Sequence, residues 1–286
     1  MKSNQILTGN PASAAAGIDE QNFERILALL RHRTGTDFGC YRPATVMRRV
    51  LNRMISVRSE GLGDYLGLLD NNVGEARQLA ERITIKVSRF YRNPLSFDLL
   101  RERVIPELAA ARAADRPLRV WSAGCGYGEE AYTLAMLLEE LGVPGQIEAT
   151  DIDLGALRIA EAAVYAGPAF AELPAALCSR FVSVDGEQHR ISAPVRDRVR
   201  FSVHDLTSSA PAPWPEAFFD LILCRNVLIY FAPQVKERAL TQVRRVLRAD
   251  GYLGLGEAEW PMSCIASTVT TLAHKARIFR AVAQPR

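Results

Sequence analysis

The stretch 119–130 constrains the fold of this chain more than any other. A short apolar run, typical of a buried strand, breaks into three glycines at alternate positions: Gly124, Gly126 and Gly128. Apolar residues then recur at helical spacing from Ala131 to Leu141. A strand, a glycine-rich turn and a helix in this order let a backbone approach a nucleotide-like ligand closely. The same pattern also occurs as a plain tight turn, and by itself it leaves both interpretations open.

The first turn of the predicted helix carries two acids, Glu129 and Glu130. A pyrophosphate favours a helix N-terminus without carboxylates, because backbone N–H groups and the positive end of the helix dipole meet the anion there. The two acids would repel a diphosphate and suit a ligand with a positive amino group or sulfonium, such as S-adenosylmethionine. Acids in a first turn are also common where they only offset the dipole.

Strands and helices alternate from this stretch onward. We predict strands at 118–123, 146–151, 199–204, 218–224 and 252–256, with helices between them. This alternation is typical of an α/β fold with a parallel, doubly wound sheet. Ligands of such sheets lie over the carboxyl ends of the strands. The sequence places Gly124, Asp151, Asp205 and Asn226 at those ends.

An acid at the end of the second strand can bind both hydroxyls of a ribose, and Asp151 has that position. We expect the nearby Asp153 to cap the following helix. The segment 181–191 has the pattern of a hairpin turning at Asp185-Gly186, within a small antiparallel insertion at about 165–198. The closing segment 276–282 is β-rich and is predicted as an edge strand.

The first part of the chain has a different character. Residues 1–18 are expected to be a disordered lead-in, and residues 19–88 a small all-α domain without strands. The second helix of this domain is rich in arginine, with Arg48, Arg49 and Arg53 in a segment without acids. These arginines form either a solvated face or a docking surface for an acidic helix.

Composition excludes several classes of protein. The net charge of +3 on 286 residues is too small to indicate nucleic-acid binding. The sequence shows neither an apolar stretch of membrane-spanning length nor a signal pattern, so no membrane insertion is expected. The five cysteines are scattered and form no metal-binding pattern, which favours free thiols in the cytoplasm and predicts no metal.

Three stretches together resemble one known family, the CheR-type chemoreceptor glutamate methyltransferases. They are the glycine turn 122–130, the segment 150–153, and Cys224-Arg-Asn-Val-Leu-Ile-Tyr-Phe231, of which the last is the most specific. The segment Phe90-Tyr91-Arg92 is similar to the family's Phe-Phe-Arg, and the resemblance extends over residues 19–282. It implies a Rossmann-like class I methyltransferase domain at 89–286, with the small β insertion, after the all-α domain at 19–88.

The resemblance also implies an activity and a partner. Members of the family transfer a methyl group from S-adenosylmethionine to glutamate side chains of cytoplasmic chemoreceptor helices, which makes the chain a protein-glutamate O-methyltransferase and leaves S-adenosylhomocysteine. We expect it to act as a monomer, without nucleic acid, and its basic helix to meet the acidic receptor helix through Arg48, Arg49 and Arg53.

By the same resemblance, Arg92 and Tyr230 are expected to be catalytic. Glu130 is expected to bind the methionine amino group and Asp151 the ribose. The other implied cofactor contacts are Lys86, Ser88, Arg92, Ala123, Gly124, Ile152, Asp205, Leu206, Asn226 and Val227.

Lys86 departs from the family, which commonly has a neutral asparagine there and a threonine at the position of Ser88. Lys86 favours the first of two alternatives that stay open. The chain could be a cofactor-binding signalling protein of low activity, or a methyltransferase for another protein carboxylate or a small molecule.

Overall fold

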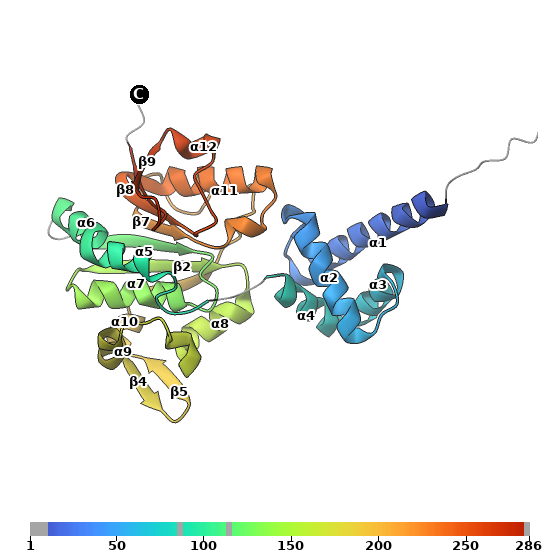
Figure 1. The fold of residues 1–286 in the computed structure, drawn as a ribbon, viewed down its shortest axis with the longest axis horizontal. Helices are drawn as coiled ribbons and strands as arrows, with labels where there is room; N and C mark the ends of the chain where they lie inside the picture. The colour runs from blue at the N-terminus through green and yellow to red at the C-terminus, as the bar shows by residue number, and fades with distance from the viewer. Residues whose placement is uncertain (1–10, 85–87, 113–115, 283–286) are drawn as a thin grey trace, which may run out of the picture. The chain divides into compact units, whose positions relative to one another are not determined.

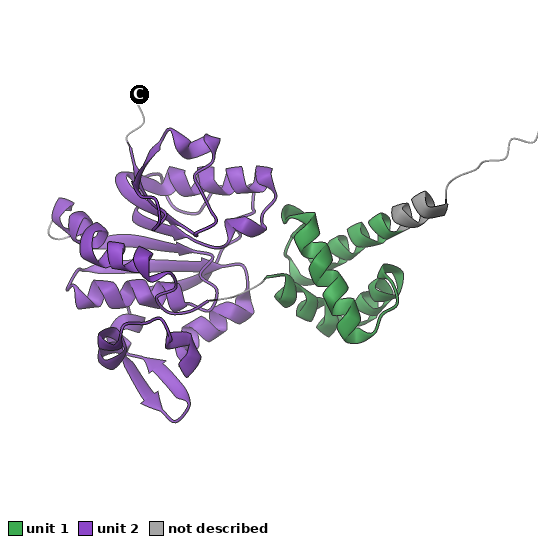
Figure 2. Cartoon of the chain, in the orientation of Figure 1, with its two compact units in different colours: residues 1–85 green, residues 86–286 purple. Residues whose placement is uncertain are grey.

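The computed structural model describes residues 11–84, 88–112 and 116–282 (Figure 1). The chain forms two compact units, residues 1–85 and 86–286 (Figure 2). The domain boundary predicted from the sequence lies after residue 88.

The described part of the first unit is entirely helical, as the sequence predicted. Its elements are α1 (Pro11–Thr34), η1 (Phe38–Cys40), α2 (Pro43–Val57), α3 (Leu62–Asn71) and α4 (Val73–Ile83). The helix α1 begins at Pro11, ahead of the start predicted near residue 19, in a segment rich in alanine, the best helix former. Residues 1–10 of the expected lead-in lie outside the described residues. The core of the unit consists of fully buried apolar side chains: Ile26, Leu30, Val50, Tyr65, Leu69 and Leu79.

The second unit is built on a seven-stranded sheet with the order β6-β2-β1-β7-β8-β10-β9. The five strands from β6 to β8 are parallel. Their bounds are β1 (Leu118–Ala123), β2 (Gly145–Asp151), β6 (Val199–Val203), β7 (Phe219–Cys224) and β8 (Leu247–Leu255). The predicted α/β fold with a mainly parallel, Rossmann-like sheet is confirmed.

The last two strands of the chain pair antiparallel to each other, and their order in the sheet corrects one prediction. The strand β10 (Ile278–Ala281) lies between β8 and β9 (Val269–Ala273), so β9 forms the edge of the sheet and the closing strand does not. Three of the four residues of β10 are buried, which is the burial expected of an interior strand.

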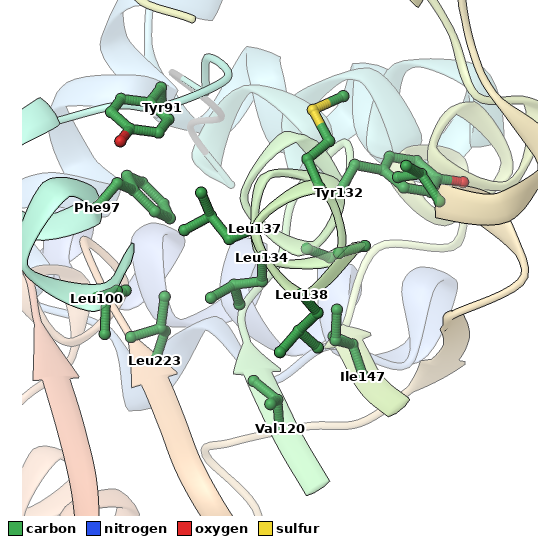
Figure 3. Close-up of a cluster of buried hydrophobic side chains, with 14 of the residues drawn as sticks. Tyr91, Phe97, Leu100, Val120, Tyr132, Leu134, Leu137, Leu138, Ile147 and Leu223 are labelled. Atoms are coloured by element: carbon green, nitrogen blue, oxygen red, sulfur yellow. The ribbon is translucent and has the colours of Figure 1, made fainter. Parts of the chain in front are cut away.

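Helices pack against the sheet and enclose its apolar side chains. They are α5 (Pro94–Leu99), the π-helical turn η2 (Leu100–Val104), α6 (Ile105–Ala111), α7 (Glu129–Glu140), α8 (Leu154–Ala162), η4 (Leu228–Tyr230), α11 (Pro233–Val246) and α12 (Ser263–Ala266). Figure 3 shows the centre of this core, where Leu134, Leu137 and Leu138 of α7 lie with side chains of three strands. The rings of Tyr91 and Phe97 lie at the same cluster, with centroids 5.2 Å apart.

The insertion between β2 and β6 has its own antiparallel sheet, with the order β3-β5-β4. It comprises β3 (Val164–Ala166), η3 (Gly167–Phe170), α9 (Ala175–Phe181), β4 (Val182–Asp185), β5 (Gln188–Ile191) and α10 (Ala193–Arg196). The predicted hairpin is β4–β5, and its Gly186 has a φ of +57°. The third strand, β3, pairs with β5 and was not predicted, because three residues are too few for a strand pattern.

Candidate cofactor and substrate site

The glycine turn after β1 requires glycine for two physical reasons. All three glycines have positive φ, with values of +77°, +57° and +92° along the chain. A Cβ on Gly124 would lie 3.1 Å from the Cβ of Val227, and a Cβ on Gly128 would lie 2.8 Å from the Cβ of Ala160. A Cβ on Gly126 would meet no described atom within 4 Å. The turn is therefore packed tightly at both ends and has room at its centre.

Asp151 lies beside this turn at the end of β2. One carboxylate oxygen accepts a hydrogen bond from the Gly126 N–H at 2.8 Å, and the other accepts from the Asp153 N–H at 3.0 Å. Asp153 caps α8 by accepting from the N–H groups of Gly155 and Ala156, as predicted. The carboxylate of Asp151 is thus held at the edge of the glycine turn, where a ribose hydroxyl could reach it.

The two acids of α7 have different surroundings. Glu130 accepts from the Ser122 hydroxyl at 2.8 Å and from the Arg225 guanidinium at 3.1 Å. Glu129 is buried, and its Oε2 has no hydrogen-bond partner among the described residues. Burial raises the pKa of Glu129, while a hydrogen bond from the Ser88 side chain acts in the opposite direction. Both carboxylates keep acceptor capacity for a cationic group of a ligand.

Arg92 stands in a backbone of unusual conformation, between Tyr91 at φ +60° and Asn93 at φ +65°. Such angles are costly for residues other than glycine, and most of all for a bulky tyrosine. We call residues 90–93 the Arg92 loop. Strain of this kind persists only where surrounding contacts impose it.

The Arg92 loop has such contacts along its whole length. Phe90 N–H donates to the Ala169 carbonyl at 3.0 Å, and Tyr91 N–H donates to the Thr133 hydroxyl at 3.1 Å. The Arg92 carbonyl accepts from Arg225 at 2.9 Å. The Asn93 N–H donates to Glu172, at 3.3 Å. The loop is fixed by the insertion through Ala169 and Glu172 and by the sheet domain through Thr133 and Arg225.

The segment after β7 carries three predicted site residues: Asn226, Val227 and Tyr230. Asn226 also has a positive φ, +59°. Its N–H donates to the carboxylate of Glu259 at 2.9 Å, as do those of Ile229 at 3.1 Å and Gly256 at 2.7 Å. Glu259 is fully buried, and this burial raises its pKa against the effect of its backbone hydrogen bonds.

Glu259 was missed in the sequence analysis, although it shapes the segment that carries Asn226. Its partners are backbone N–H groups, which leave no side-chain pattern in the sequence. The signal that could have found it is Gly256, three residues earlier, where a Cβ would lie 2.7 Å from both the Asn226 nitrogen and the Glu259 carboxylate.

Asp205 and Leu206 follow β6, at the same carboxyl ends of the parallel strands. Asp205 accepts from both the N–H and the hydroxyl of Thr207, each at 2.7 Å. The preceding His204 donates its N–H to the Asp151 carbonyl at 3.1 Å, which ties this segment to β2. Leu206 is buried.

Most predicted cofactor contacts are therefore gathered at the carboxyl ends of the parallel strands. Ala123, Gly124, Glu130, Asp151, Ile152, Asp205, Leu206, Asn226 and Val227 lie at or just after the carboxyl ends of β1, β2, β6 and β7. Ser88 joins them through Glu129, and Arg92 through Arg225. Tyr230 lies in η4 of the same unit. Lys86 lies outside the described residues.

The three predicted docking residues lie in the other unit, and the structure separates their roles. Arg53 donates two hydrogen bonds of 2.7 Å to the Glu75 carboxylate of α4, and its side chain is only 16% exposed. The Arg53 guanidinium is therefore paired within the helical unit, with a buried acid that lies 22 residues further along the chain. Arg48 is exposed, and Arg49 is partly exposed. That Arg53 docks a partner stays a prediction, made for a side chain that is already paired within the helical unit.

The residues of this site fit S-adenosylmethionine. The unpartnered oxygen of Glu129 and the carboxylate of Glu130 suit a ligand with a positive amino group. Asp151 lies where a ribose can be bound, and the space at Gly126 allows a close approach. Within the described ranges, no group of three or more His, Cys, Asp or Glu side chains could hold a metal ion.

Comparisons with known proteins agree with this geometry. Residues 86–269 match the family described as "CheR methyltransferase, SAM binding domain", and residues 21–84 match "CheR methyltransferase, all-alpha domain". A chemotaxis protein methyltransferase of Listeria monocytogenes is 31% identical over 84% of this chain and 90% of its own length.

Two other relatives are longer than this chain. An uncharacterized 104.1 kDa protein of Rhodobacter capsulatus is 37% identical over 90% of this chain, which spans only 27% of that protein. A probable biofilm formation methyltransferase of Pseudomonas putida is 32% identical over 83% of this chain and 56% of its own length. With both domains matched along most of its length, the chain belongs to the CheR methyltransferase family, and its second unit is an S-adenosylmethionine-binding domain.

Proposed function

We propose that this protein transfers a methyl group from S-adenosylmethionine to glutamate side chains of chemoreceptor or chemoreceptor-like helices in the cytoplasm, acting as a monomer. The observation that carries the proposal is the Arg92 loop. A strained backbone, fixed from two sides, carries an arginine whose carbonyl binds Arg225, the partner of the acid expected to hold the cofactor. Arginine is suited to orient a carboxylate, which is the group that would receive the methyl.

The chemistry requires orientation more than acid–base help. A glutamate carboxylate is already ionised at neutral pH, since its reference pKa is about 4.3. When bound, S-adenosylmethionine supplies an electrophilic methyl group on a positive sulfur. The roles left to the chain are to align the carboxylate with that methyl and to remove water from around it. We assign the alignment to Arg92 and Tyr230, and the binding of the cofactor's amino group to Glu130.

The helical domain would bind the substrate through one face of α2. This face combines exposed Arg48 with two exposed apolar side chains, Leu51 at 45% and Ile55 at 75%. Positions 48, 51 and 55 share one side of a helix. A face with both positive and apolar groups suits an amphipathic helix that carries acids, which is the chemistry of a helix with methylatable glutamates.

The first test is calorimetric titration of the full chain with S-adenosylmethionine and with S-adenosylhomocysteine, followed by a tritiated-methyl assay on receptor fragments. Arg92→Ala is expected to lower methyl transfer by about a hundredfold, the scale of a lost orienting group. Its affinity for S-adenosylhomocysteine should stay within about threefold of wild type. Arg103→Ala is the matched control, because Arg103 is an exposed arginine of the same domain and pairs with Glu107 outside the Arg92 loop.

Three results would contradict the proposal. Equal losses of transfer and of cofactor affinity in Arg92→Ala would remove the assigned role of Arg92. Cofactor binding without transfer to any receptor fragment would favour a signalling protein of low activity or another carboxylate substrate. If neither cofactor form released heat, the cofactor site itself would be impaired.

A further inference from the structure

Arg225 is an almost completely enclosed charged residue near the cofactor site, with a side chain that is only 2% exposed. It directly follows β7 in the chain. Its guanidinium lies over the ring of Phe97, with 5.1 Å from Cζ to the ring centroid. A cation so deeply buried must be paired and hydrogen-bonded to be tolerated. The identity of its partners therefore shows what the residue does.

The partners of Arg225 belong to two different parts of the site. Nη1 donates to the Glu130 carboxylate at 3.1 Å. Nη2 donates to the Arg92 carbonyl and to the Asn93 side-chain oxygen, both at 2.9 Å. One rigid, planar group thus joins the acid expected to hold the cofactor to the loop expected to orient the substrate.

The Arg92 loop depends on such support, because Tyr91 and Asn93 are both held at positive φ. The position of Arg225 in turn depends on Glu130, which is its one ion-pair partner among the described residues. Loss of the charge on Glu130 would leave the guanidinium buried without a counter-ion among the described residues.

We propose that Arg225 is a positioning residue: its guanidinium is anchored by the Glu130 carboxylate and holds the strained Arg92 loop in place. The conformation of the loop that orients the substrate then depends on the acid that binds the cofactor. The proposed function enters only through the role of Arg92. The coupling between Glu130 and the loop is a property of the chain that can be measured without any methyl acceptor.

The test is amide hydrogen exchange of the full chain, followed over peptides that cover residues 89–99. The N–H groups of Tyr91 and Asn93 are hydrogen-bonded to Thr133 and Glu172, so their exchange reports opening of the loop. Arg225→Lys keeps a positive charge but cannot reach all three oxygens at once. We expect exchange at these amides to become about ten- to a hundredfold faster, the scale of lost hydrogen bonds to a charged group.

The decisive variant is Glu130→Gln, which should also accelerate exchange in the loop. Ser122→Ala is its control, because Ser122 contacts the other oxygen of Glu130 and not Arg225. In an Arg225→Lys background, Glu130→Gln should add nothing further. Arg116→Lys controls for the loss of an arginine paired with a buried acid, since Arg116, whose side chain is 29% exposed, pairs with buried Asp220 at the opposite end of the strands and should leave exchange in the loop unchanged.

Methyl transfer at saturating S-adenosylmethionine is the second measurement. Arg225→Lys should lower kcat by about tenfold or more, whereas Arg116→Lys should leave kcat at the wild-type value. Unchanged loop exchange in Glu130→Gln, or equal effects of Arg225→Lys and Arg116→Lys, would overturn the proposal. Accelerated exchange in Glu130→Gln and Arg225→Lys, in a protein that methylates no receptor fragment, would instead overturn the proposed substrate and leave the coupling intact.

Discussion

Each of the two units contains a buried arginine–glutamate pair, and the two pairs differ in what surrounds them. In the helical unit, Arg53 and Glu75 form two parallel hydrogen bonds of 2.7 Å, and Tyr65 donates a third to the same carboxylate at 2.8 Å. In the sheet domain, Arg225 donates one hydrogen bond to Glu130 and two more to residues 92 and 93 of the Arg92 loop.

This difference separates a structural pair from a positioning pair. The Arg53–Glu75 pair joins α2 to α4, two regular helices in which no residue has a positive φ. The Arg225–Glu130 pair joins the first turn of α7 to the strained Arg92 loop at the cofactor site. Residue types and burial are nearly the same in both, so the backbone around a buried pair, and not the pair itself, indicates whether its role is stability or function.

The largest effect is expected from breaking the structural pair. Glu75→Ala removes the buried acceptor that Arg53 and the Tyr65 hydroxyl share and leaves Arg53 with Gln78 as a partner, which should destabilise the helical unit by about 1–3 kcal/mol. Urea denaturation followed by circular dichroism measures this loss. All three tryptophans, Trp121, Trp214 and Trp260, lie in the sheet domain, so their fluorescence follows that domain separately.

The matched control for this prediction is Glu81→Ala, at an exposed position of the same helix, which should change stability by less than about 0.5 kcal/mol. Affinity for S-adenosylhomocysteine should be unchanged in both variants. A shift of the tryptophan transition in Glu75→Ala without a shift of the helical signal would contradict the assignment of the pair to the helical unit.

The contrast between the pairs also shows what could be predicted from the sequence. The parallel strands, the glycine turn and the acid at the end of β2 follow local rules of periodicity and position, and all three were predicted, although the order of the strands was not. The Arg53–Glu75 pair was not, because its partners lie on different helices and no local pattern links them. The positive φ of Tyr91 was equally hidden, since a tyrosine carries no sequence signal for that conformation.

The order of the last strands escaped prediction for a related reason. β9 and β10 are both short, and either could have been the edge by its pattern alone. Long-range pairing with β8 decides the order, through the register of Ile278 with Gly254. A Cβ at position 254 would clash with the Leu223 side chain of β7 and lie 3.2 Å from that of Ile278, so the small residue allows β8 to pack between β7 and β10.

A smaller effect is expected on the pH dependence of stability, to which Glu75 of the helical unit and Glu129 of the sheet domain should contribute with opposite signs. The hydrogen bonds from Arg53 are the first cause of a lowered pKa at Glu75, so its contribution to stability is present above about 4.5 and is lost as the pH falls through the folded pKa. Burial is the first cause of a raised pKa at Glu129. Its contribution is complete below about 4.5 and is lost as the pH rises through the folded pKa.

Thermal unfolding of the ligand-free protein checks both signs. Glu129→Gln should raise the Tm at pH 8, by the equivalent of about 1 kcal/mol, and should change it little at pH 4.5. Glu75→Gln should lower the Tm at pH 7, with a difference from wild type that narrows between pH 5 and pH 3. The same direction of change for both variants at neutral pH would show that the two acids do not differ as their surroundings indicate.

The smallest effect is expected on the exposed side of α2, and it sharpens the distinction between its arginines. Arg48→Ala should leave the free energy of unfolding within about 0.5 kcal/mol of wild type, because Arg48 is exposed. It should raise the KM for a receptor fragment by about two- to fivefold at low salt, since an exposed ion pair contributes about 0.2–1 kcal/mol. The difference should fade at high salt as the charges are screened. Arg82→Ala, an exposed arginine on α4, should change neither quantity. If Arg48→Ala and Arg82→Ala gave the same KM as wild type at low salt, α2 would not be the docking helix, and its exposed arginines would be only a solvated face.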